Sequence, residues 1–437
     1  MMNKIVKPSI LPGFMELLPK EQIAFNKIKD IIESTYEKFG FIPIDTPVIE
    51  KSEVLLAKGG GETEKQIYRF EKGDTDLSLR FDLTVPLARY VAQHTNDLNF
   101  PFRRYHIGKV YRGERNQKGR FREFYQCDID IIGNGKLSII NDAEIPSVIY
   151  SIFKELDFGP FTIRINNRKL LNGFFTEVTD IDKSSILRTI DKIDKIGKDN
   201  VVDELLILGV LNESIDRILE FISIKGSNDS ILEGLKNLKI ANEEFNEGLN
   251  ELNQVVHYIR GFNVPEENFV IDLTIARGLD YYTGTIYETQ LNDYKSIGSV
   301  CSGGRYDNLA EYYTKSKLPG VGISIGLTRL FYQLNEANLI KFDDIASSSK
   351  VIIIPMGDFV DYSIEVANSL RANDINCEIY FEDGKVKKKF GYADKLGVSY
   401  AIIIGEEEKE KSLVSVKNLK TGEQTQVTLE EAISIIE

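Results

Sequence analysis

Two β-rich stretches, residues 103–114 and 120–132, stand close together in the chain and most constrain what it can fold into. The loop between them is short and polar, so we predict a long antiparallel hairpin. Side chains two residues apart on a strand share a face. By this parity Arg112 shares a face with Glu114, and one set shares a face on the second strand: Arg120, Arg122, Phe124, Gln126, Asp128 and Asp130. That face combines arginines, an aromatic ring and carboxylates.

The same hairpin is basic, although the chain as a whole has a net charge of -13. Between residues 101 and 122 there is one acid, Glu114, and there are eight basic residues: Arg103, Arg104, Lys109, Arg112, Arg115, Lys118, Arg120 and Arg122. A guanidinium can bind two phosphate oxygens at once, and a ring such as Phe124 can stack on a purine. We therefore predict a nucleotide site without a Walker loop. The alternative is a charged hairpin that is only solvated.

The regions around the hairpin predict a mixed α and β domain. Residues 20–40 follow helical spacing, and residues 41–49, with Pro43 and Pro47, suit an edge or interface strand. Helical runs dominate from about 180 to 257, which we interpret as an inserted helical module. Strand-like sequence returns at 269–272 and 279–289, and the segment 320–326 leads into a helix that begins at Leu327.

A second domain follows a linker over residues 335–350, which contains three consecutive serines. Beyond it, apolar strands alternate with helices: 351–355, 360–372, 377–380, 386–396 and 400–404. Uninterrupted apolar strands with intervening helices predict a small α/β domain with a largely parallel sheet.

Composition narrows the class of protein. Hydrophobic residues make up 42% and charged residues 28% of the 437 residues, as in globular proteins. We find no signal-peptide-like start and no apolar run of membrane-spanning length, so we expect a cytoplasmic protein with no membrane partner. Cys127, Cys301 and Cys377 have no paired spacing, which indicates buried thiols rather than disulfides or a zinc site.

Several strings resemble a known family. Residues 40–49, with Pro47, resemble motif 1 of class II aminoacyl-tRNA synthetases. Residues 111–124 resemble motif 2, and residues 320–331, with Arg329, resemble motif 3. The strings RGLDYYTG at 277–284 and GGRYD at 303–307 resemble the two signature peptides of histidyl-tRNA synthetases. Together with residues 79–84 and 124–130, the resemblance covers essentially the whole chain.

The resemblance implies an α+β fold with an antiparallel sheet flanked by helices. It places the catalytic core at residues 1–335, the inserted helical module at 175–258, the linker at 336–350 and an α/β anticodon-binding domain at 351–437. It also implies a homodimer, because motif 1 forms the subunit interface in this family.

The implied activity is that of a histidine-tRNA ligase, which activates histidine with ATP and transfers it to tRNA-His. By resemblance, Arg112 and Arg277 bind the α-phosphate and are catalytic, Arg329 binds the γ-phosphate, and Glu114 binds the adenine amine beside Phe124. Mg²⁺ is expected with the ATP phosphates, and no zinc is expected. The alternative for Arg277 and Arg329 is a structural ion pair.

On the amino-acid side, Asp82, Thr84 and Gln126 match the family positions that bind the ammonium group. Asp130 and Tyr282 match those that contact the imidazole ring, with Tyr306 nearby. Asp130 lies on the predicted pocket face, where an imidazole N–H would satisfy a buried carboxylate. The alternative is an acid paired with a neighbouring arginine.

Two regions point to tRNA by resemblance. The hairpin loop, with Arg115 and Gln117, matches the loop that contacts the acceptor end. In the C-terminal domain Lys385, Lys387, Lys388 and Lys389 either contact the anticodon or belong to an ordinary exposed helix.

Two other classes of protein share this core. One is a non-catalytic regulatory paralogue in histidine biosynthesis, which typically lacks the anticodon domain and erodes the motifs. The other is an adenylate-forming amide ligase that acts on a small molecule. The presence of Arg112, Glu114, Arg277, Arg329 and residues 351–437 favours the synthetase.

Overall fold

The computed structural model describes residues 5–57, 62–114, 119–190, 192–275, 282–340 and 347–437. They fall into two compact units, one of Met1–Met15 and Ile28–Leu339 and the other of Glu16–Lys27 and Ile340–Glu437. Three predicted site residues, Arg115, Gln117 and Arg277, lie outside the described residues. Within the described part of the chain, no helix is long and apolar enough to span a membrane.

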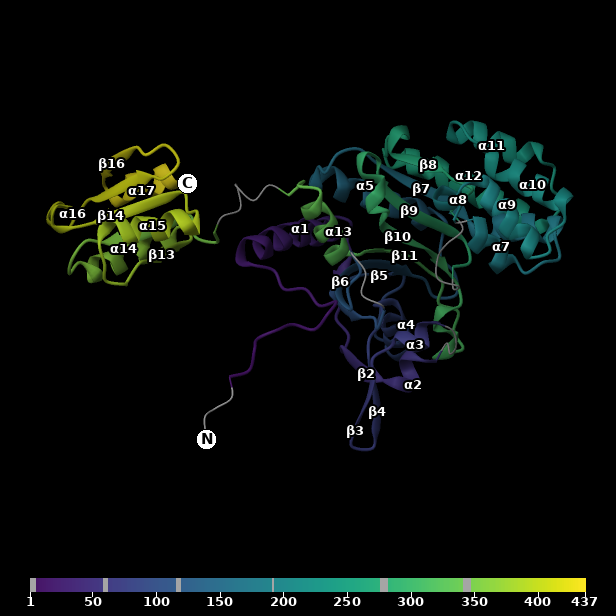
Figure 1. Ribbon diagram of the computed structural model, residues 1–437, viewed down its shortest axis with the longest axis horizontal. Helices are drawn as coiled ribbons and strands as arrows, with labels where there is room; N and C mark the ends of the chain where they lie inside the picture. The colour runs from purple at the N-terminus through teal and green to yellow at the C-terminus, as the bar shows by residue number, and fades with distance from the viewer. Residues whose placement is uncertain (1–4, 58–61, 115–118, 191, 276–281, 341–346) are drawn as a thin grey trace. The chain divides into compact units, whose positions relative to one another are not determined.

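An eight-stranded sheet forms the frame of the first unit (Figure 1). Its strands, in spatial order, are β1 (Ile42–Pro43), β5 (Phe102–Tyr111), β6 (Glu123–Ile132), β11 (Gly320–Ile325), β10 (Ser299–Tyr306), β9 (Thr285–Leu291), β7 (Phe161–Asn167) and β8 (Phe269–Ile271). Neighbours from β5 to β7 run antiparallel, while β1 and β8 add in parallel at the two edges. The predicted antiparallel sheet is confirmed.

The predicted hairpin lies within this sheet. β5 and β6 pair in register from Phe102 opposite Ile132 to Tyr111 opposite Glu123. The expected strand over residues 41–49 is instead two short strands, because β1 ends at Pro43 and β2 (Ile49–Lys51) joins a different, three-stranded sheet with β4 (Thr75–Leu79) and β3 (Arg69–Lys72). The edge position is confirmed, since proline lacks the N–H that a central ladder needs.

Two helices cover one face of the large sheet. In α1 (Pro19–Lys38) the Tyr36 hydroxyl donates to the carbonyl oxygen of Cys127 on β6, at 2.9 Å. In α5 (Ile140–Leu156) the carbonyl of Asp142 accepts from the Tyr287 hydroxyl on β9, at 2.7 Å. The side chains that alternate with these residues project from the opposite face of the sheet, where the pocket described below is formed.

Most of the remaining helices of the first unit follow one another in a single run. That run is the predicted inserted module, which lies between β7 and β8 and consists of α6 (Arg168–Val178), α7 (Lys183–Ile190), α8 (Ile193–Ile196), α9 (Lys198–Ile207), α10 (Asn212–Ser223), α11 (Asn228–Asn237) and α12 (Glu243–Gly261). Elsewhere the helices are α2 (Ser52–Leu55), α3 (Glu62–Gln66), α4 (Thr84–Gln93) and α13 (Leu327–Glu336), with 3-10 turns η1 (Glu266–Asn268), η2 (Asn292–Ile297) and η3 (Leu309–Tyr312).

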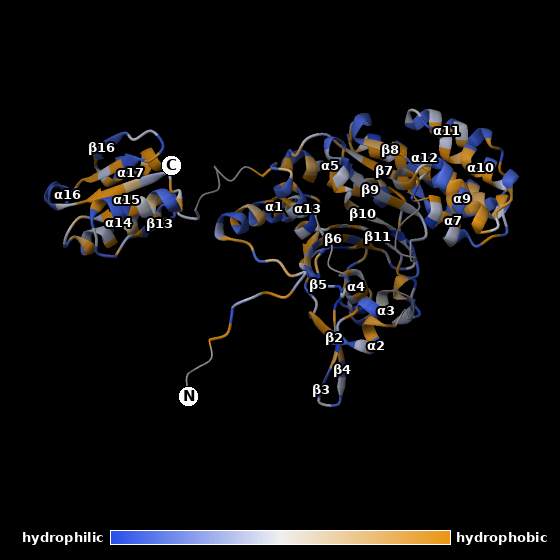
Figure 2. Ribbon diagram, in the orientation of Figure 1, coloured by the Kyte–Doolittle hydropathy of each residue, from blue (hydrophilic) through white to orange (hydrophobic). Residues whose placement is uncertain are grey.

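The second unit contains a five-stranded sheet in the order β13 (Cys377–Ile379), β12 (Val351–Pro355), β14 (Tyr400–Ile404), β15 (Val414–Asn418) and β16 (Gln424–Val427). Its C-terminal helices are α14 (Val360–Ala372), α15 (Val386–Leu396), α16 (Glu406–Lys411) and α17 (Leu429–Ile436). Every residue of β12 is buried, as predicted for a strand covered on both faces. In Figure 2 the helix α16 is coloured as hydrophilic.

The prediction of a largely parallel sheet is wrong for half of this sheet. β13, β12 and β14 are parallel, but β14–β15 and β15–β16 pair antiparallel. Antiparallel neighbours need only a short connection, so no long crossover separates β15 from β16. The first three residues of β16 are exposed, so it lacks the apolar run that marked the other strands.

Candidate active site

A cavity of about 430 Å³ opens in the first unit and brings together the predicted site residues. Those that the structure describes all line it: Asp82, Thr84, Arg112, Glu114, Phe124, Gln126, Asp130, Tyr282, Tyr306 and Arg329. They come from segments spread over about 250 residues of sequence (329 - 82 = 247). The sheet and the first turns of α4 and α13 are what unite them.

The parity prediction for β6 holds within the strand and for Arg120, which also lines the cavity, but it fails at Arg122. Phe124, Gln126 and Asp130 line the cavity, as does Asp128. Arg122 does not, because β6 begins at Glu123 and strand alternation does not extend to Arg122. Its Nε donates to the Glu114 carbonyl at 3.0 Å and its backbone N–H donates to the Gly13 carbonyl at 2.7 Å.

Arg112 is held by two aromatic rings. The centre of its guanidinium lies 4.3 Å from the centroid of the Phe81 ring and 5.1 Å from that of Phe124. Its Nε also donates to the Phe81 carbonyl at 3.1 Å. Cation–π contact and a hydrogen bond fix a side chain that would otherwise have many rotamers. A positive charge is therefore already positioned in the pocket.

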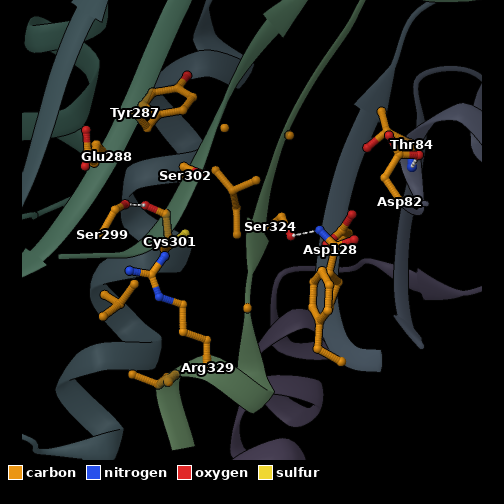
Figure 3. Close-up of a pocket in the computed structure, with 18 of the residues that line it drawn as sticks. Asp82, Thr84, Asp128, Tyr287, Glu288, Ser299, Cys301, Ser302, Ser324 and Arg329 are labelled. Carbon is orange, nitrogen blue, oxygen red and sulfur yellow. Dashed lines mark hydrogen bonds between the residues drawn. The ribbon is translucent and has the colours of Figure 1, made fainter. Parts of the chain in front are cut away.

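Two further charged groups border the same end of the cavity. Arg329, in the first turn of α13, donates from Nη2 to the Ile297 carbonyl at 3.2 Å. Glu114 accepts from Arg120 Nη1 at 3.4 Å. Figure 3 shows Arg329 extending into the space below Cys301 and Ser324. Two arginines, Arg112 and Arg329, thus face a cavity that also contains the Phe124 ring, which suits the phosphates and base of a nucleotide.

Asp82 lies at the start of α4 and is 8% exposed. Its Oδ1 accepts from the backbone N–H groups of Val85 at 2.9 Å and Thr84 at 3.2 Å. Burial raises the pKa of Asp82, and the two backbone hydrogen bonds with the charges of Arg112 and Arg104 oppose that rise. The helix start therefore fixes one oxygen of this carboxylate.

Asp130 is held on both oxygens by protein groups. Oδ1 accepts from the Tyr306 hydroxyl at 2.7 Å, and Oδ2 forms an ion pair with Nη2 of Arg104. Burial raises the pKa of Asp130 to about 6, although Arg104 and Tyr306 lower it. The alternative role of Asp130, an ion pair with a neighbouring arginine, is therefore present, and Asp130 also lines the cavity.

Two glycines of β11 make room for this arrangement. A Cβ on Gly322 would overlap the Ile129 carbonyl and the Asp130 carboxylate, and one on Gly320 would overlap the Tyr306 ring. Gly322 lies directly opposite Asp130, and Gly320 lies opposite Tyr306. Close packing around the carboxylate therefore explains Gly320 and Gly322.

Sequence reasoning missed two buried partners. Arg104, which is 0% exposed, is one of the basic residues of the hairpin, and its cross-strand position opposite Asp130 is the signal that could have revealed the pair. Arg305, within the string at 303–307, donates to Asp142 from Nε at 3.0 Å and from Nη2 at 2.6 Å. Strand parity turns Arg305 away from the pocket and towards α5. It is a structural residue next to a pocket residue, Tyr306.

All three cysteines are buried free thiols, as predicted. Burial raises the pKa of Cys127 and Cys301, and Cys301 lines the cavity. Within the described residues no group of three or more His, Cys, Asp or Glu side chains is arranged to hold a metal ion.

Comparison with known proteins gives a consistent result. Residues 13–330 match the model of the family described as Histidyl-tRNA synthetase, and residues 350–437 match the Anticodon binding domain. A histidine--tRNA ligase of Clostridium tetani is 69% identical over 437 residues, covering 100% of this chain and 99% of the relative. One of Finegoldia magna is 53% identical, covering 98% and 99%. The crystal structure of histidyl-tRNA synthetase from Nostoc sp. PCC 7120 is 41% identical, with a TM-score of 0.91 over 99% of both chains.

Proposed function

The chain belongs to the histidyl-tRNA synthetase family and is a histidine-tRNA ligase, and we propose that the cavity beside β6 is where it activates histidine with ATP and transfers it to tRNA-His. The observation that supports this location is the convergence of all ten described site residues on one cavity. The high identity to a histidine-tRNA ligase over the full chain also favours the synthetase over a regulatory paralogue.

In this proposal ATP occupies the end of the cavity that is bordered by Arg112 and Arg329. Attack of the histidine carboxylate on the α-phosphate builds negative charge, which positioned cations stabilise. Arg112, already held between Phe81 and Phe124, meets the α-phosphate together with Arg277, and Arg329 meets the γ-phosphate. The Phe124 ring stacks on adenine and Glu114 accepts from its amine.

Magnesium enters with ATP rather than with the protein. The described residues offer no ready metal cage, and Mg²⁺ commonly binds through substrate phosphates while it keeps several waters. When bound, the ion neutralises phosphate charge. The absence of a zinc requirement stays a prediction.

Histidine occupies the end of the cavity that is bordered by the carboxylates of Asp82 and Asp130. Asp82, Thr84 and Gln126 bind the ammonium group, and Asp130 and Tyr282 contact the imidazole ring. Tyr306 holds Asp130 by the hydrogen bond described above. Pairing both polar atoms of the ring would separate histidine from isosteres that lack ring nitrogens.

tRNA contacts lie partly outside the described residues. We assign the acceptor end to the loop with Arg115 and Gln117, and the anticodon to the C-terminal domain at residues 351–437. The core at 1–335, the helical module at 175–258 and the linker at 336–350 complete the proposed domain organisation. We further propose a cytoplasmic homodimer that uses the exposed edge at β1. Light scattering at micromolar concentration should give twice the chain mass, and a monomer mass would disprove the dimer.

The test of the function has two steps. Histidine-dependent ATP–pyrophosphate exchange should be measured first, and histidine transfer to tRNA-His second. Both should occur. A regulatory paralogue would bind histidine without exchange, and an amide ligase would show exchange without charging tRNA.

A further inference from the structure

One carboxylate in the cavity wall, Asp128, has no role in the function proposed above. It lies on β6 between Gln126 and Asp130, is 2% exposed, and borders the cavity. Ser324 of β11 lies directly opposite it in the sheet, and Ser302 of β10 lies next to Ser324. Figure 3 shows the same succession across the cavity wall, with Ser324 between Ser302 and Asp128.

Two acceptor atoms on this wall have no hydrogen-bond partner among the described residues. They are Oδ1 of Asp128 and Oε1 of Gln126, and both are buried. Gln126 uses its amide nitrogen to donate to the Ser324 hydroxyl oxygen at 2.7 Å, which turns its carbonyl oxygen away from Ser324. A buried acceptor without a donor is costly, so a ligand that donates to both atoms would recover free energy.

The neighbouring groups are engaged elsewhere. Arg104 pairs with Asp130, and Oδ1 of Asp82 accepts from the first turn of α4. Asp82, Asp128 and Asp130 together carry three carboxylates, and the charge of Arg104 acts on all three. A ligand group with a positive charge and several hydrogen-bond donors fits this excess of carboxylates over positive charges.

We propose that Asp128 is a further substrate-binding residue, whose Oδ1 accepts a hydrogen bond from the ammonium group of histidine beside Oε1 of Gln126. The proposal rests on the proposed function and deepens it. An ammonium group has three donors and no acceptor, which matches the two unpartnered acceptor atoms, Oδ1 of Asp128 and Oε1 of Gln126. A neutral imidazole has one donor and one acceptor, so it fits this wall less well than the ammonium group.

The charge of the Asp128 carboxylate depends on whether a cationic ligand group is bound beside it. Burial raises the pKa of Asp128 to about 7; the charge of Arg104 and a hydrogen bond with Ser324 lower it, and the charges of Asp130 and Asp82 raise it further. The other titratable groups near this carboxylate are those of Tyr36 on α1, Cys127 on β6, Cys301 on β10 and His106 on β5, which lies opposite it in the sheet. A bound ammonium group would favour the ionised form, so binding is coupled to loss of a proton from Asp128.

The test compares ligands that keep or lack the ammonium group. Histidinol has the ammonium group and the imidazole ring, whereas 3-(imidazol-4-yl)propanoate has the ring without an amine. Asp128→Asn should weaken histidine and histidinol binding about 10- to 100-fold, the scale of a hydrogen bond to a charged group. Binding of the propanoate should stay within about twofold of the parent.

Equal losses for all three ligands would overturn the proposal, since they would indicate a ring contact or a structural role. Unchanged binding of histidine would overturn it too. Asp128→Ser, measured in the same way, keeps the test valid if the first variant folds poorly, and it should show the same selectivity. Ile129→Val, on the same strand but facing away from the cavity, is the matched control and should bind all three ligands like the parent.

The two proposals fail in different ways. If the parent protein shows no histidine-dependent pyrophosphate exchange, the proposed function is wrong. If the parent exchanges normally and Asp128→Asn retains the parental KM for histidine, only the assignment of Asp128 is wrong.

Discussion

The Tyr306 hydroxyl donates to Oδ1 of Asp130 across 2.7 Å, although 176 positions separate the two residues in the sequence. Arg104 pairs with the other oxygen. Each carboxylate oxygen can accept a second hydrogen bond, so the pair orients Asp130 without exhausting it. A ligand N–H would meet an acceptor that is already fixed in place.

Asp130→Asn should therefore raise the KM for histidine strongly and change the KM for ATP little. The amide loses the negative charge and turns a donor toward one of its present partners. Pyrophosphate-exchange kinetics at varied histidine and ATP check this. A histidine KM equal to that of the parent would leave Asp130 with a structural role beside Arg104.

Arg277→Ala should reduce the kcat of adenylation at least about 100-fold, the scale of one lost charge-stabilising donor. Histidine binding should be nearly retained, because the proposed contact is strongest at the charge that develops on the α-phosphate. Exchange kinetics with equilibrium binding of histidine separate the two effects. Equal damage to both would make Arg277 a ground-state anchor instead.

Replacing Arg115 or Gln117 with alanine should slow the charging of tRNA-His and leave pyrophosphate exchange close to normal, since the proposed contact is with the acceptor end and not with ATP. Both rates should be measured on the same preparation. A parallel fall of the two rates would contradict the assignment of this loop to tRNA.

Asp142→Ala should destabilise the first unit by about 3–5 kcal/mol, the usual cost when one partner of a buried ion pair is removed. Asp142 is 0% exposed and Arg305 is 6% exposed. Thermal melting measures the loss. Glu204→Ala, which breaks an exposed pair with Lys192 at 2.7 Å, is the control and should melt close to the parent.

Asp128→Asn should gain stability relative to the parent as the pH rises from 5 to 8. The pKa of Asp128 is about 7 in the fold and about 3.9 in an unfolded chain. The folded parent therefore holds a proton over this window that the unfolded parent has lost, so its stability falls as the pH rises. Asparagine has no such proton, and the gain reaches on the order of a few kcal/mol at pH 8. A difference in Tm that is constant from pH 5 to 8 would show that Asp128 titrates at its ordinary pKa.

Local signals predicted the elements that local physics decides. Residues 351–355, 360–372, 386–396 and 400–404 form strands and helices with those bounds, because apolar runs and helical spacing lie within each segment. The strand β16 has mostly exposed residues and gave no such signal. Residues 41–49 also gave no signal that the chain leaves the edge of one sheet at Pro43 and joins another at Ile49, six residues later.

In the candidate site, too, some residues could be predicted from local sequence and others could not. Strand parity placed Gln126 and Asp130 in the cavity because alternation is a property of one strand. Parity failed for Arg122, which precedes the strand. The pair of Arg104 with Asp130 depends on the register of the hairpin. The contacts of Tyr306 with Asp130 and of Asp142 with Arg305 join distant segments, which a single strand does not encode.

Gly322 restricts which substitutions could make the protein resistant to an inhibitor. Any side chain at this position would collide with Asp130. A compound that rests on the bare backbone of β11 would thus contact a surface that cannot gain a side chain without damage to the carboxylate beside it. Resistance by substitution at residue 322 should come with loss of activity, and selection should instead favour changes elsewhere in the cavity.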